Sequence, residues 1–306
     1  MSLTTAPCAV CEGTSFTMVY PRTIQDVEAD PALYYSSSRQ RAGYLDIVRC
    51  ASCGLLLTNP RDDDRTIARV YRALHDTTYD GEDDNRRRTA RAFLDLVHRH
   101  TARHGRRIGR LLDIGCATGV FATVAHEAGW EATGVEASAW AVARAKQRCP
   151  DATFVQGLLE DVDLPAGAFD AVTLWDVLEH VRSPIETLSR ARSWVAAPHG
   201  RLFLNLPNAG SLTARGMGRH WVLLLREHLW YFDPATMARL LQRAGFEMIQ
   251  TRPNSVQFSV KNVLTRAAQY QGLTGRLAGR FAAVPLMQRV HVRFRMGEMQ
   301  VVARPR

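Results

Sequence analysis

The chain has 306 residues, 46% of them hydrophobic, and a formal net charge of +9. This length allows one large domain or two smaller ones, and the hydrophobic content is ordinary for a globular protein. The longest apolar runs fall far short of the ~18 residues that a membrane-spanning helix needs. Because no charged-then-apolar signal segment begins the chain, we expect a cytoplasmic protein.

The positive charge does not by itself indicate nucleic-acid binding. All basic residues except Lys146 and Lys261 are arginine, a bias that a GC-rich coding sequence explains as well as a ligand does. The excess is local, and an acidic run, Asp80 to Asp84, lies beside the cluster at 86–110 and partly cancels it. We therefore expect a small-molecule acceptor and no nucleic acid. The sequence predicts no oligomeric state.

Two Cys-x-x-Cys pairs mark residues 1–63 as a zinc-binding ribbon. They are Cys8, Cys11, Cys50 and Cys53. Inside a cell such pairs indicate metal rather than disulfides. Two tight turns with two sulfurs each complete a tetrahedral zinc site with no open position, so the predicted zinc is structural. Few apolar residues lie nearby, so we expect the metal to supply much of the folding energy and the intervening segment to have no core of its own.

Residues 64–105 are predicted to form a helical linker and cofactor lid. Apolar residues recur at helical spacing over 64–75 and again over 86–104. The apolar face of the second helix consists of Ala90, Phe93, Leu94 and Val97. Arginines occupy its opposite face, which we interpret as a solvated surface.

Residues 110–119 predict a strand, a glycine turn and the start of a helix. Asp113 closes the strand, and a Gly-x-x-x-Gly loop follows, the order that places a nucleotide-type ligand at the carboxyl end of a parallel sheet. The next strand ends in Glu136, where a carboxylate can accept both hydroxyls of a ribose. The loop lacks the further glycine of a dinucleotide site. A sulfonium nucleoside without phosphate therefore fits better.

This loop, read as Leu112-Asp-Ile-Gly-Cys-Ala-Thr-Gly119, resembles the first motif of class I S-adenosylmethionine-dependent methyltransferases. The resemblance implies an α/β, Rossmann-like core of seven strands over 106–306, following the N-terminal zinc-ribbon module. It also implies that S-adenosylmethionine binds along the ends of four strands. The implied cofactor residues are Asp113, Gly115, Cys116, Ala117, Thr118, Gly119, Glu136, Ala137, Gly157, Leu158, Leu159, Trp175 and Asp176. Another Rossmann-like nucleotide-binding domain is the alternative.

The remaining core elements alternate in the α/β manner. Further strands are expected at 153–155, 169–175, 200–206, 246–251 and 299–303, the last pairing antiparallel at the sheet edge. Further helices are expected at 138–147, 183–196 and 233–244. The second of these helices begins with a predicted capping box from Ser183 to Glu186, and Gly245 ends the third.

Residues 256–296 are predicted to form an insertion before the last strand. Apolar residues at helical spacing, beginning at Val256 and Val260, predict a largely helical segment over the substrate crevice. We expect a lid or an association surface there. Weak contact with a membrane surface is a secondary interpretation of this basic stretch.

Two segments carry the candidate catalytic residues. The fourth predicted strand ends in Asp176-Val-Leu-Glu-His180, and Glu227-His228 precedes an aromatic turn. A Glu-His pair facing His180 makes a proton-accepting site, so we predict His228 as the base, with Glu227 holding its ring and His180 as the orienting or second base. The alternative is that His228 only hydrogen-bonds a loop.

Together, the Cys pairs, the glycine loop and these two segments resemble the zinc-ribbon methyltransferases that include deoxysugar C-methyltransferases of antibiotic pathways. The resemblance implies methyl transfer to a carbon or oxygen of a small acceptor, such as a nucleotide-linked sugar or another secondary metabolite, with Glu227, His228 and His180 lining the site. An RNA methyltransferase that grips RNA with the ribbon and the arginines is the alternative.

The segment Asp176-x-x-Glu179-His180 also resembles ubiquinone-type O-methyltransferases and small-RNA 3′-end methyltransferases. In those enzymes acidic and histidine side chains hold a divalent ion. This second resemblance implies a possible divalent metal at Asp176, Glu179, His180 and His228. The simple acid/base site is the other reading, and the choice of carbon or oxygen as acceptor atom stays open.

Overall fold

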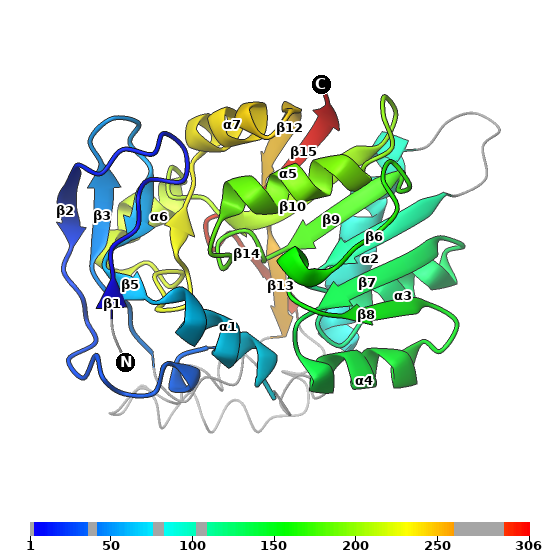
Figure 1. The fold of residues 1–306 in the computed structure, drawn as a ribbon, viewed down its shortest axis with the longest axis horizontal. Helices are drawn as coiled ribbons and strands as arrows, with labels where there is room; N and C mark the ends of the chain where they lie inside the picture. Colours follow the sequence, from blue (N-terminus) through cyan, green and yellow to red (C-terminus); the bar gives the residue numbers. More distant parts are fainter. Residues whose placement is uncertain (1–2, 36–41, 76–82, 102–108, 260–290) are drawn as a thin grey trace. The chain divides into compact units, whose positions relative to one another are not determined.

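The computed structural model describes residues 3–35, 42–75, 83–101, 109–259 and 291–306. The chain divides into two compact units, Met1–Pro253 with Gly297–Arg306 and Asn254–Met296. The first unit contains a seven-stranded mixed sheet with helices on its faces and a smaller four-stranded sheet (Figure 1). Within the described ranges, no helix is long and apolar enough to cross a membrane.

The large sheet confirms the predicted Rossmann-like α/β fold. Its strand order is β12 (Phe246–Pro253), β15 (Glu298–Pro305), β10 (Arg201–Pro207), β9 (Ala171–Trp175), β6 (Arg110–Ile114), β7 (Glu131–Glu136) and β8 (Thr153–Gln156). The strands from β10 to β8 are mutually parallel. The prediction that the last strand lies at the sheet edge is wrong. β15 pairs antiparallel with both β10 and β12, and its run of buried residues is typical of an inner strand.

Alternate residues of each central strand enter two different cores. In β10, Leu202 and Leu204 face the cluster that contains α5 (Pro184–Trp194) and α7 (Pro234–Arg243). Phe203 faces the cluster built by α2 (Asp83–Thr101) and α3 (Val120–Glu127) on the other side. Side chains that alternate with a period of two bury both faces of the sheet, and Figure 1 shows the helices that cover these faces.

Short polar side chains start the helices of this unit. Ser138 accepts a hydrogen bond from the Ala141 N–H and begins α4 (Ala139–Arg148). Ser183 accepts from the Glu186 N–H at the start of α5, but no reciprocal bond from Glu186 completes the predicted capping box within the described structure. The Glu186 side chain lines a cavity instead. A complete capping box occurs at the start of α7, where Asp233 and Thr236 exchange hydrogen bonds.

The four-stranded sheet joins the N-terminal module to a later part of the chain. Its order is β11 (Trp230–Tyr231), β4 (Leu56–Thr58), β3 (Ile47–Cys50) and β2 (Phe16–Tyr20), all antiparallel. The remaining short elements are β1 (Leu3–Thr4), β5 (Arg61–Asp62), η1 (Pro31–Leu33), α1 (Asp64–Arg72), η3 (Leu159–Asp161), α6 (Leu212–Met217) and η4 (Gly218–His220).

The segment between the two cysteine pairs contributes to a core, which we did not expect. Ile24, Tyr34, Tyr35 and Leu45 are buried together with Val70 of α1. The two tyrosines supply large apolar rings, and α1 supplies the surface that covers them. This core is therefore shared between the ribbon segment and the helix that follows it.

The second unit begins and ends in paired strands. β13 (Val256–Ser259) pairs antiparallel with β14 (His291–Phe294). The prediction of a helix is therefore wrong at both ends of 256–296, where apolar and polar residues alternate in the sequence as strands require. The rest of the predicted insertion, 260–290, lies outside the described residues. The boundaries predicted at 63 and 105 remain predictions.

Asp113 on β6 gives the sheet a pH-dependent stability. It is buried, and Thr173 Oγ1 donates to its Oδ1 at 2.8 Å. Burial raises the pKa of Asp113 to about 7. The folded protein therefore favours the neutral acid. The stability that this preference provides is fully present below the ordinary pKa of aspartate and is lost as the pH rises through about 7.

We expect Asp113→Asn to remove this pH dependence. As the pH rises from 5 to 7, the free energy of unfolding of the ligand-free wild type should fall relative to that of the variant. The fall should be at most about 1.4 kcal/mol per pH unit. Denaturant unfolding at several pH values measures the difference. Asp95→Asn, at an exposed position on α2, is the matched control. Parallel stability curves for wild type and Asp113→Asn would contradict the assignment.

Candidate active site

The four cysteines of the two Cys-x-x-Cys pairs lie together. The Sγ atoms of Cys8, Cys11, Cys50 and Cys53 are all within 4.8 Å of one another. The Cys8–Cys53 and Cys11–Cys50 sulfur pairs are 3.4 and 3.5 Å apart, close to the ~3.8 Å separation of two thiolates bound tetrahedrally to zinc. Burial raises the pKa of Cys50, but hydrogen bonds from the Cys53 and Ser52 N–H groups and from the Cys11 and Cys8 thiols together lower it to about 7. This donor set fits a structural zinc ion.

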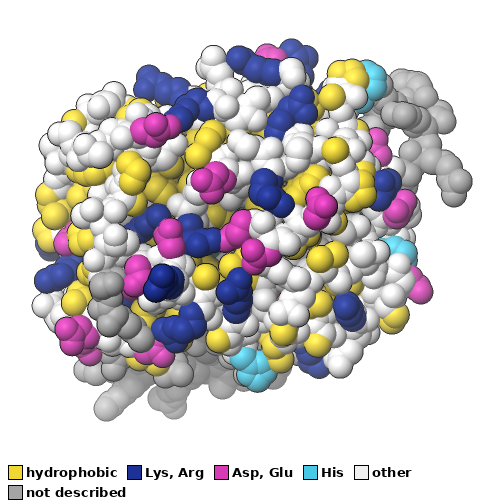
Figure 2. Space-filling view, in the orientation of Figure 1, with side chains coloured by type: hydrophobic (Ala, Val, Ile, Leu, Met, Phe, Trp, Pro, Cys, Tyr) yellow, Lys and Arg dark blue, Asp and Glu magenta, His cyan; other side chains and the backbone are white. Residues whose placement is uncertain are grey.

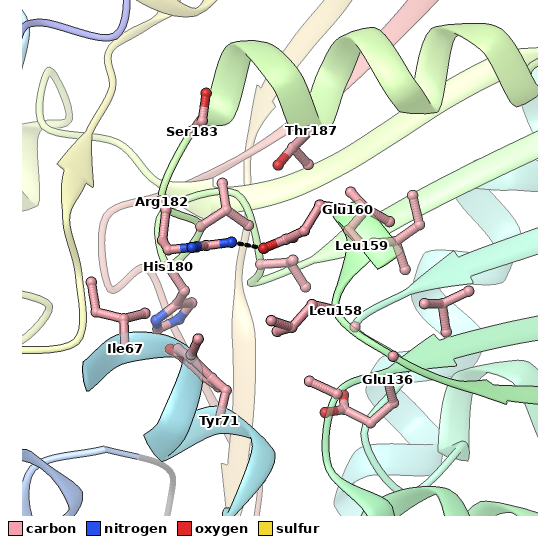
Figure 3. Close-up of a pocket in the computed structure, with 18 of the residues that line it drawn as sticks. Ile67, Tyr71, Glu136, Leu158, Leu159, Glu160, His180, Arg182, Ser183 and Thr187 are labelled. Atoms are coloured by element: carbon pink, nitrogen blue, oxygen red, sulfur yellow. Dashed lines mark ion pairs between the residues drawn. The ribbon is translucent and has the colours of Figure 1, made fainter. Parts of the chain in front are cut away.

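A cavity of about 970 Å³ lies at the carboxyl ends of β6, β7 and β9 (Figure 3). Parallel strands all end at one edge of a sheet, so side chains far apart in the sequence meet there. One end of the cavity is lined by Gly115 and Glu136, and the other by His180 and Glu227. In Figure 3, Tyr71 and His180 lie side by side at one end, away from Glu136.

The glycine loop turns sharply below the cavity. Gly115 has a φ of +69°, and a Cβ there would approach Val177 Cγ2 to 2.5 Å. Gly119 has a φ of +74° and faces Ala145 and Phe154 rather than the cavity. Both glycines are thus required by a left-handed backbone conformation and by close packing of the loop against its neighbours.

Glu136 ties this loop to the following helix. One carboxylate oxygen accepts from the Ala117 N–H at 3.1 Å, and the other from the Ser138 N–H at 3.0 Å. Burial raises the pKa of Glu136, and these N–H donors oppose the shift. Each carboxylate oxygen has two lone pairs, so both can still accept from a ligand hydroxyl.

The structure brings most of the predicted cofactor residues to the cavity. Those that line it are Gly115, Ala117, Glu136, Ala137, Gly157, Leu158, Leu159, Trp175 and Asp176. Among the described residues, the four that do not line it are Asp113, Cys116, Thr118 and Gly119. These four are buried in or below the loop, which they shape from behind. Trp175 stacks on Phe93 at 4.2 Å, and its Nε1 is buried without a partner in the described part of the chain, so a ligand acceptor fits there.

Asp176 occupies a strained position directly after β9. Its φ is +57°, which costs energy for a residue other than glycine and is common at functional sites. Asn205 Nδ2 donates to Asp176 Oδ1 at 2.5 Å. Burial raises the pKa of Asp176 to about 8, and the nearby Glu298 carboxylate adds to the shift. The side chain is held toward the sheet by Asn205.

The two predicted histidines face each other. The rings of His180 and His228 are 4.7 Å apart in an edge-on arrangement. His180 Nδ1 lies 3.1 Å from the Glu227 carbonyl oxygen, and His228 Nδ1 lies 2.8 Å from that of Leu223. Glu227 therefore contacts a histidine through its backbone, and that histidine is His180 rather than its neighbour in sequence.

Only one of the two histidines reaches the cavity. Among the described residues that line it, His180 and Glu227 are present and His228 is not. His228 is buried beside His180. We predicted His228 as the base, but adjacent residues point in different directions. This geometry gives His180 the direct access to a bound molecule.

Among the residues that the structure describes, Glu179, His180 and His228 form a second group that could hold a metal ion. Their candidate ligand atoms lie within 4.8 Å of one another, and His180 Nε2 is 4.0 Å from Glu179 Oε1. Burial raises the pKa of Glu179 well above its usual value, and the Asp176 carboxylate adds to the shift. Asp176, which we predicted as a fourth ligand, is outside this described group.

Helix α1 belongs to the segment that we predicted as a linker and cofactor lid, and it contributes residues to the cavity. Ile67, Ala68 and Tyr71 on this helix, followed by Leu74, line the cavity. The Tyr71 ring lies edge-on to His180 at 6.2 Å, and its buried hydroxyl has no partner among the described residues. The helical spacing of these four residues was visible in the sequence. The contact of Tyr71 with His180 was not, because it depends on segments distant in the sequence.

The strand order, with one antiparallel strand beside the edge, and the glycine loop below a cavity define a nucleoside-binding α/β enzyme fold of the class I methyltransferase type. Residues 85–251, more than half of the chain, match the family described as "Methyltransferase domain". The chain belongs to this family.

The chain is also similar to methyltransferases of known name. A ubiquinone biosynthesis O-methyltransferase from Chromobacterium violaceum is 28% identical over 165 residues, covering 50% of this chain and 69% of that protein. The mitochondrial enzyme of the same name from Schizosaccharomyces pombe is 31% identical over 132 residues, covering 41% and 46%. A magnesium protoporphyrin IX methyltransferase structure from Synechocystis PCC 6803, with bound SAH, has a TM-score of 0.48 at 14% identity and covers 78% of this chain and 93% of that one.

The protein is therefore an S-adenosylmethionine-dependent methyltransferase, as the sequence predicted. The four-cysteine cluster near the N-terminus fits the predicted zinc ribbon. The roles of individual residues remain predictions, which the following experiments test.

We expect about one equivalent of zinc per chain in freshly purified protein. Cys50→Ser should lower both the zinc content and the thermal midpoint, because a structural site contributes its binding energy to folding. Metal analysis and thermal unfolding measure these effects. Cys149→Ser, at a buried cysteine outside the cluster, should keep its zinc. Less than half an equivalent in the wild type, or full stability of Cys50→Ser, would count against the site.

Glu136→Ala should weaken binding of S-adenosylhomocysteine by about tenfold to a hundredfold. The change removes a charged acceptor, worth on the order of 1.5 to 3 kcal/mol. Calorimetry measures the affinity. Glu160→Ala, which removes another cavity-lining carboxylate, should have a smaller effect. Unchanged affinity in Glu136→Ala would mean that the ribose binds elsewhere.

Proposed function

We propose that this methyltransferase acts on a carbon or oxygen of a small-molecule acceptor, with His180 as the group that accepts the acceptor's proton. The observation that carries the proposal is the single cavity that joins the Gly115 and Glu136 end to the His180 and Glu227 end. A cavity of about 970 Å³ suits a cofactor together with a small molecule.

In this proposal S-adenosylmethionine lies over the glycine loop. Glu136 accepts its ribose hydroxyls, and Leu158 and Leu159 offer apolar surface to its adenine. The backbone N–H groups and the carboxylate at this end suit a nucleoside without phosphates. When bound, the cofactor supplies an electrophilic methyl group, and the protein must orient the acceptor in line with it.

His180 is suited to take a proton from the acceptor. If its Nδ1–H donates to the Glu227 carbonyl, the Nε2 lone pair is the accepting site. Glu179, 4.0 Å from Nε2, favours the charged ring that forms. Burial raises the pKa of Glu179, and a proton gained by His180 would oppose this shift because the two charges attract. His228 supports the ring of His180 from the side.

The arginines at the rim of the cavity favour an acceptor that carries a negative charge, such as a nucleotide-linked sugar. A second hollow of about 660 Å³ shares Asp64, Leu158 and Arg182 with the cavity. Four arginines line it: Arg65, Arg69, Arg72 and Arg182. Three of them form ion pairs, Arg69 with Asp30 at 3.7 Å, Arg72 with Asp161 at 3.0 Å and Arg182 with Glu160. An incoming phosphate would compete with these carboxylates for bidentate contacts.

RNA is not part of this proposal. Figure 2 shows basic and acidic side chains interspersed across this face rather than one continuous basic surface. Binding of RNA through phosphates would weaken steeply with salt, so a salt titration separates the two acceptor classes.

A second candidate mechanism places a divalent ion at Glu179, His180 and His228, whose ligand atoms lie close enough together.

His180→Asn should lower the single-turnover rate by about a hundredfold or more while leaving affinity for S-adenosylhomocysteine within twofold. Acceptors are sought among nucleotide-linked sugars and phenolic metabolites by following cofactor consumption. His220→Asn, at an exposed position, is the control and should keep the wild-type rate.

Two further measurements decide between the mechanisms. If a chelator removes activity while the structural zinc is retained, and added Mg²⁺ then restores the activity, the mechanism with a divalent ion is favoured. Retention of most of the rate by His180→Asn would remove His180 as the proton acceptor.

A further inference from the structure

Arg226, the residue before Glu227, forms a fully buried ion pair with the N-terminal module. Its Nη2 and Nε donate to the two carboxylate oxygens of Asp62 at 2.7 and 2.9 Å. The Arg226 side chain is 0% exposed and that of Asp62 is 3% exposed. A two-pronged contact of this kind fixes the orientation of both side chains as well as their separation.

The other contacts of this guanidinium come from the same module. Arg226 Nη2 donates to the Val27 carbonyl at 3.2 Å and Nη1 to that of Ala29 at 3.4 Å. Its carbon atom Cζ lies 5.0 Å from the centre of the Tyr34 ring. Within the described part of the chain, the side-chain partners of Arg226 thus belong to residues 27–62. The arginine anchors its own segment to a region distant in sequence.

The backbone that follows Arg226 is held by the same module. Thr58 Oγ1 donates to the His228 carbonyl at 2.7 Å, and the Thr58 N–H donates to the Leu229 carbonyl at 3.0 Å. β11 then pairs with β4. On its other side, the Leu229 N–H donates to the Glu179 carbonyl at 2.8 Å. The segment from Arg226 to Leu229 is therefore fixed between the N-terminal module and the loop after β9.

This segment supplies the carbonyl oxygen that is hydrogen-bonded to a ring nitrogen of His180. Glu227 is the residue between Arg226 and His228, and its carbonyl lies 3.1 Å from His180 Nδ1. A displacement of the segment would change the orientation of both histidine rings. Buried ion pairs add little to stability compared with apolar residues of the same shape, whereas they select one arrangement. Small displacements of a reacting group lower rates strongly.

We propose that Asp62 and Arg226 are positioning residues for the methyl-transfer site, acting together with Thr58 to hold the Glu227–His228 segment against His180. The proposal rests on the proposed role of His180. It assigns the N-terminal module a function in addition to binding metal. Neither Asp62 nor Arg226 is among the described residues that line the cavity, so they act through the backbone of the segment.

The test uses two variants of nearly unchanged shape in the full-length, zinc-loaded protein. Asp62→Asn removes the charge of the pair, and Thr58→Val removes the hydroxyl that donates to His228. Asp83→Asn is the control, because Asp83 forms a 2.7 Å ion pair with Arg148 away from this segment. Should Asp62→Asn fail to fold, Thr58→Val alone decides the outcome.

The readout is the nuclear magnetic resonance signals of histidine rings labelled at Cε1. Signals of His180 and His228 are assigned by their loss in His180→Asn and His228→Asn. We expect both test variants to shift one or both signals, while affinity for S-adenosylhomocysteine stays within twofold. With an acceptor available, the single-turnover rate should fall about tenfold. Asp83→Asn should change none of these.

Unchanged histidine signals in both test variants would overturn the proposal, even if their thermal midpoints fall. So would a parallel loss of cofactor affinity, since that indicates a general loss of structure. The proposed function fails separately. It fails if His180→Asn keeps the wild-type rate, whatever the ring signals of the Asp62 and Thr58 variants show.

Discussion

The constraint on which the site depends is that parallel strands all end at one edge of their sheet. The loop at Gly115, the carboxylate of Glu136 and the strained Asp176 lie at the ends of β6, β7 and β9, which are adjacent in the sheet although helices separate them along the chain. The backbone hydrogen bonds between these strands fix the position of each. The cofactor half of the cavity therefore needs few contacts from outside the sheet to take its shape.

The other half of the cavity depends on contacts between distant segments. Ile67 and Tyr71 of α1 line this half, and Glu227 lines it as well. Both segments are joined to the ribbon, one through a shared core and the other through β4 and the Asp62 ion pair. Such long-range contacts carry a loop-closure entropy cost that local contacts do not.

This difference explains which features could be predicted from the sequence. The glycine loop, Glu136 and the alternation of strands and helices follow from local spacing, and the structure contains them. The inner position of β15 could not be read from its residues, since strand order is a property of the whole sheet. The orientation of His228 relative to His180 also depends on where the Glu227 segment is anchored. Tyr71 was missed because helical spacing identifies a buried face without naming its partner.

The pairing of β12 with β15 has a consequence for how the chain can vary. Pro253 and Met299 are register partners, so the sheet holds together the two ends of the segment between them. Changing the length of a loop whose ends are already fixed adds only a slowly growing entropy cost. This position is therefore a tolerant site for exchange of chain segments. A change in the length of this segment would leave in place the strand ends that line the cavity.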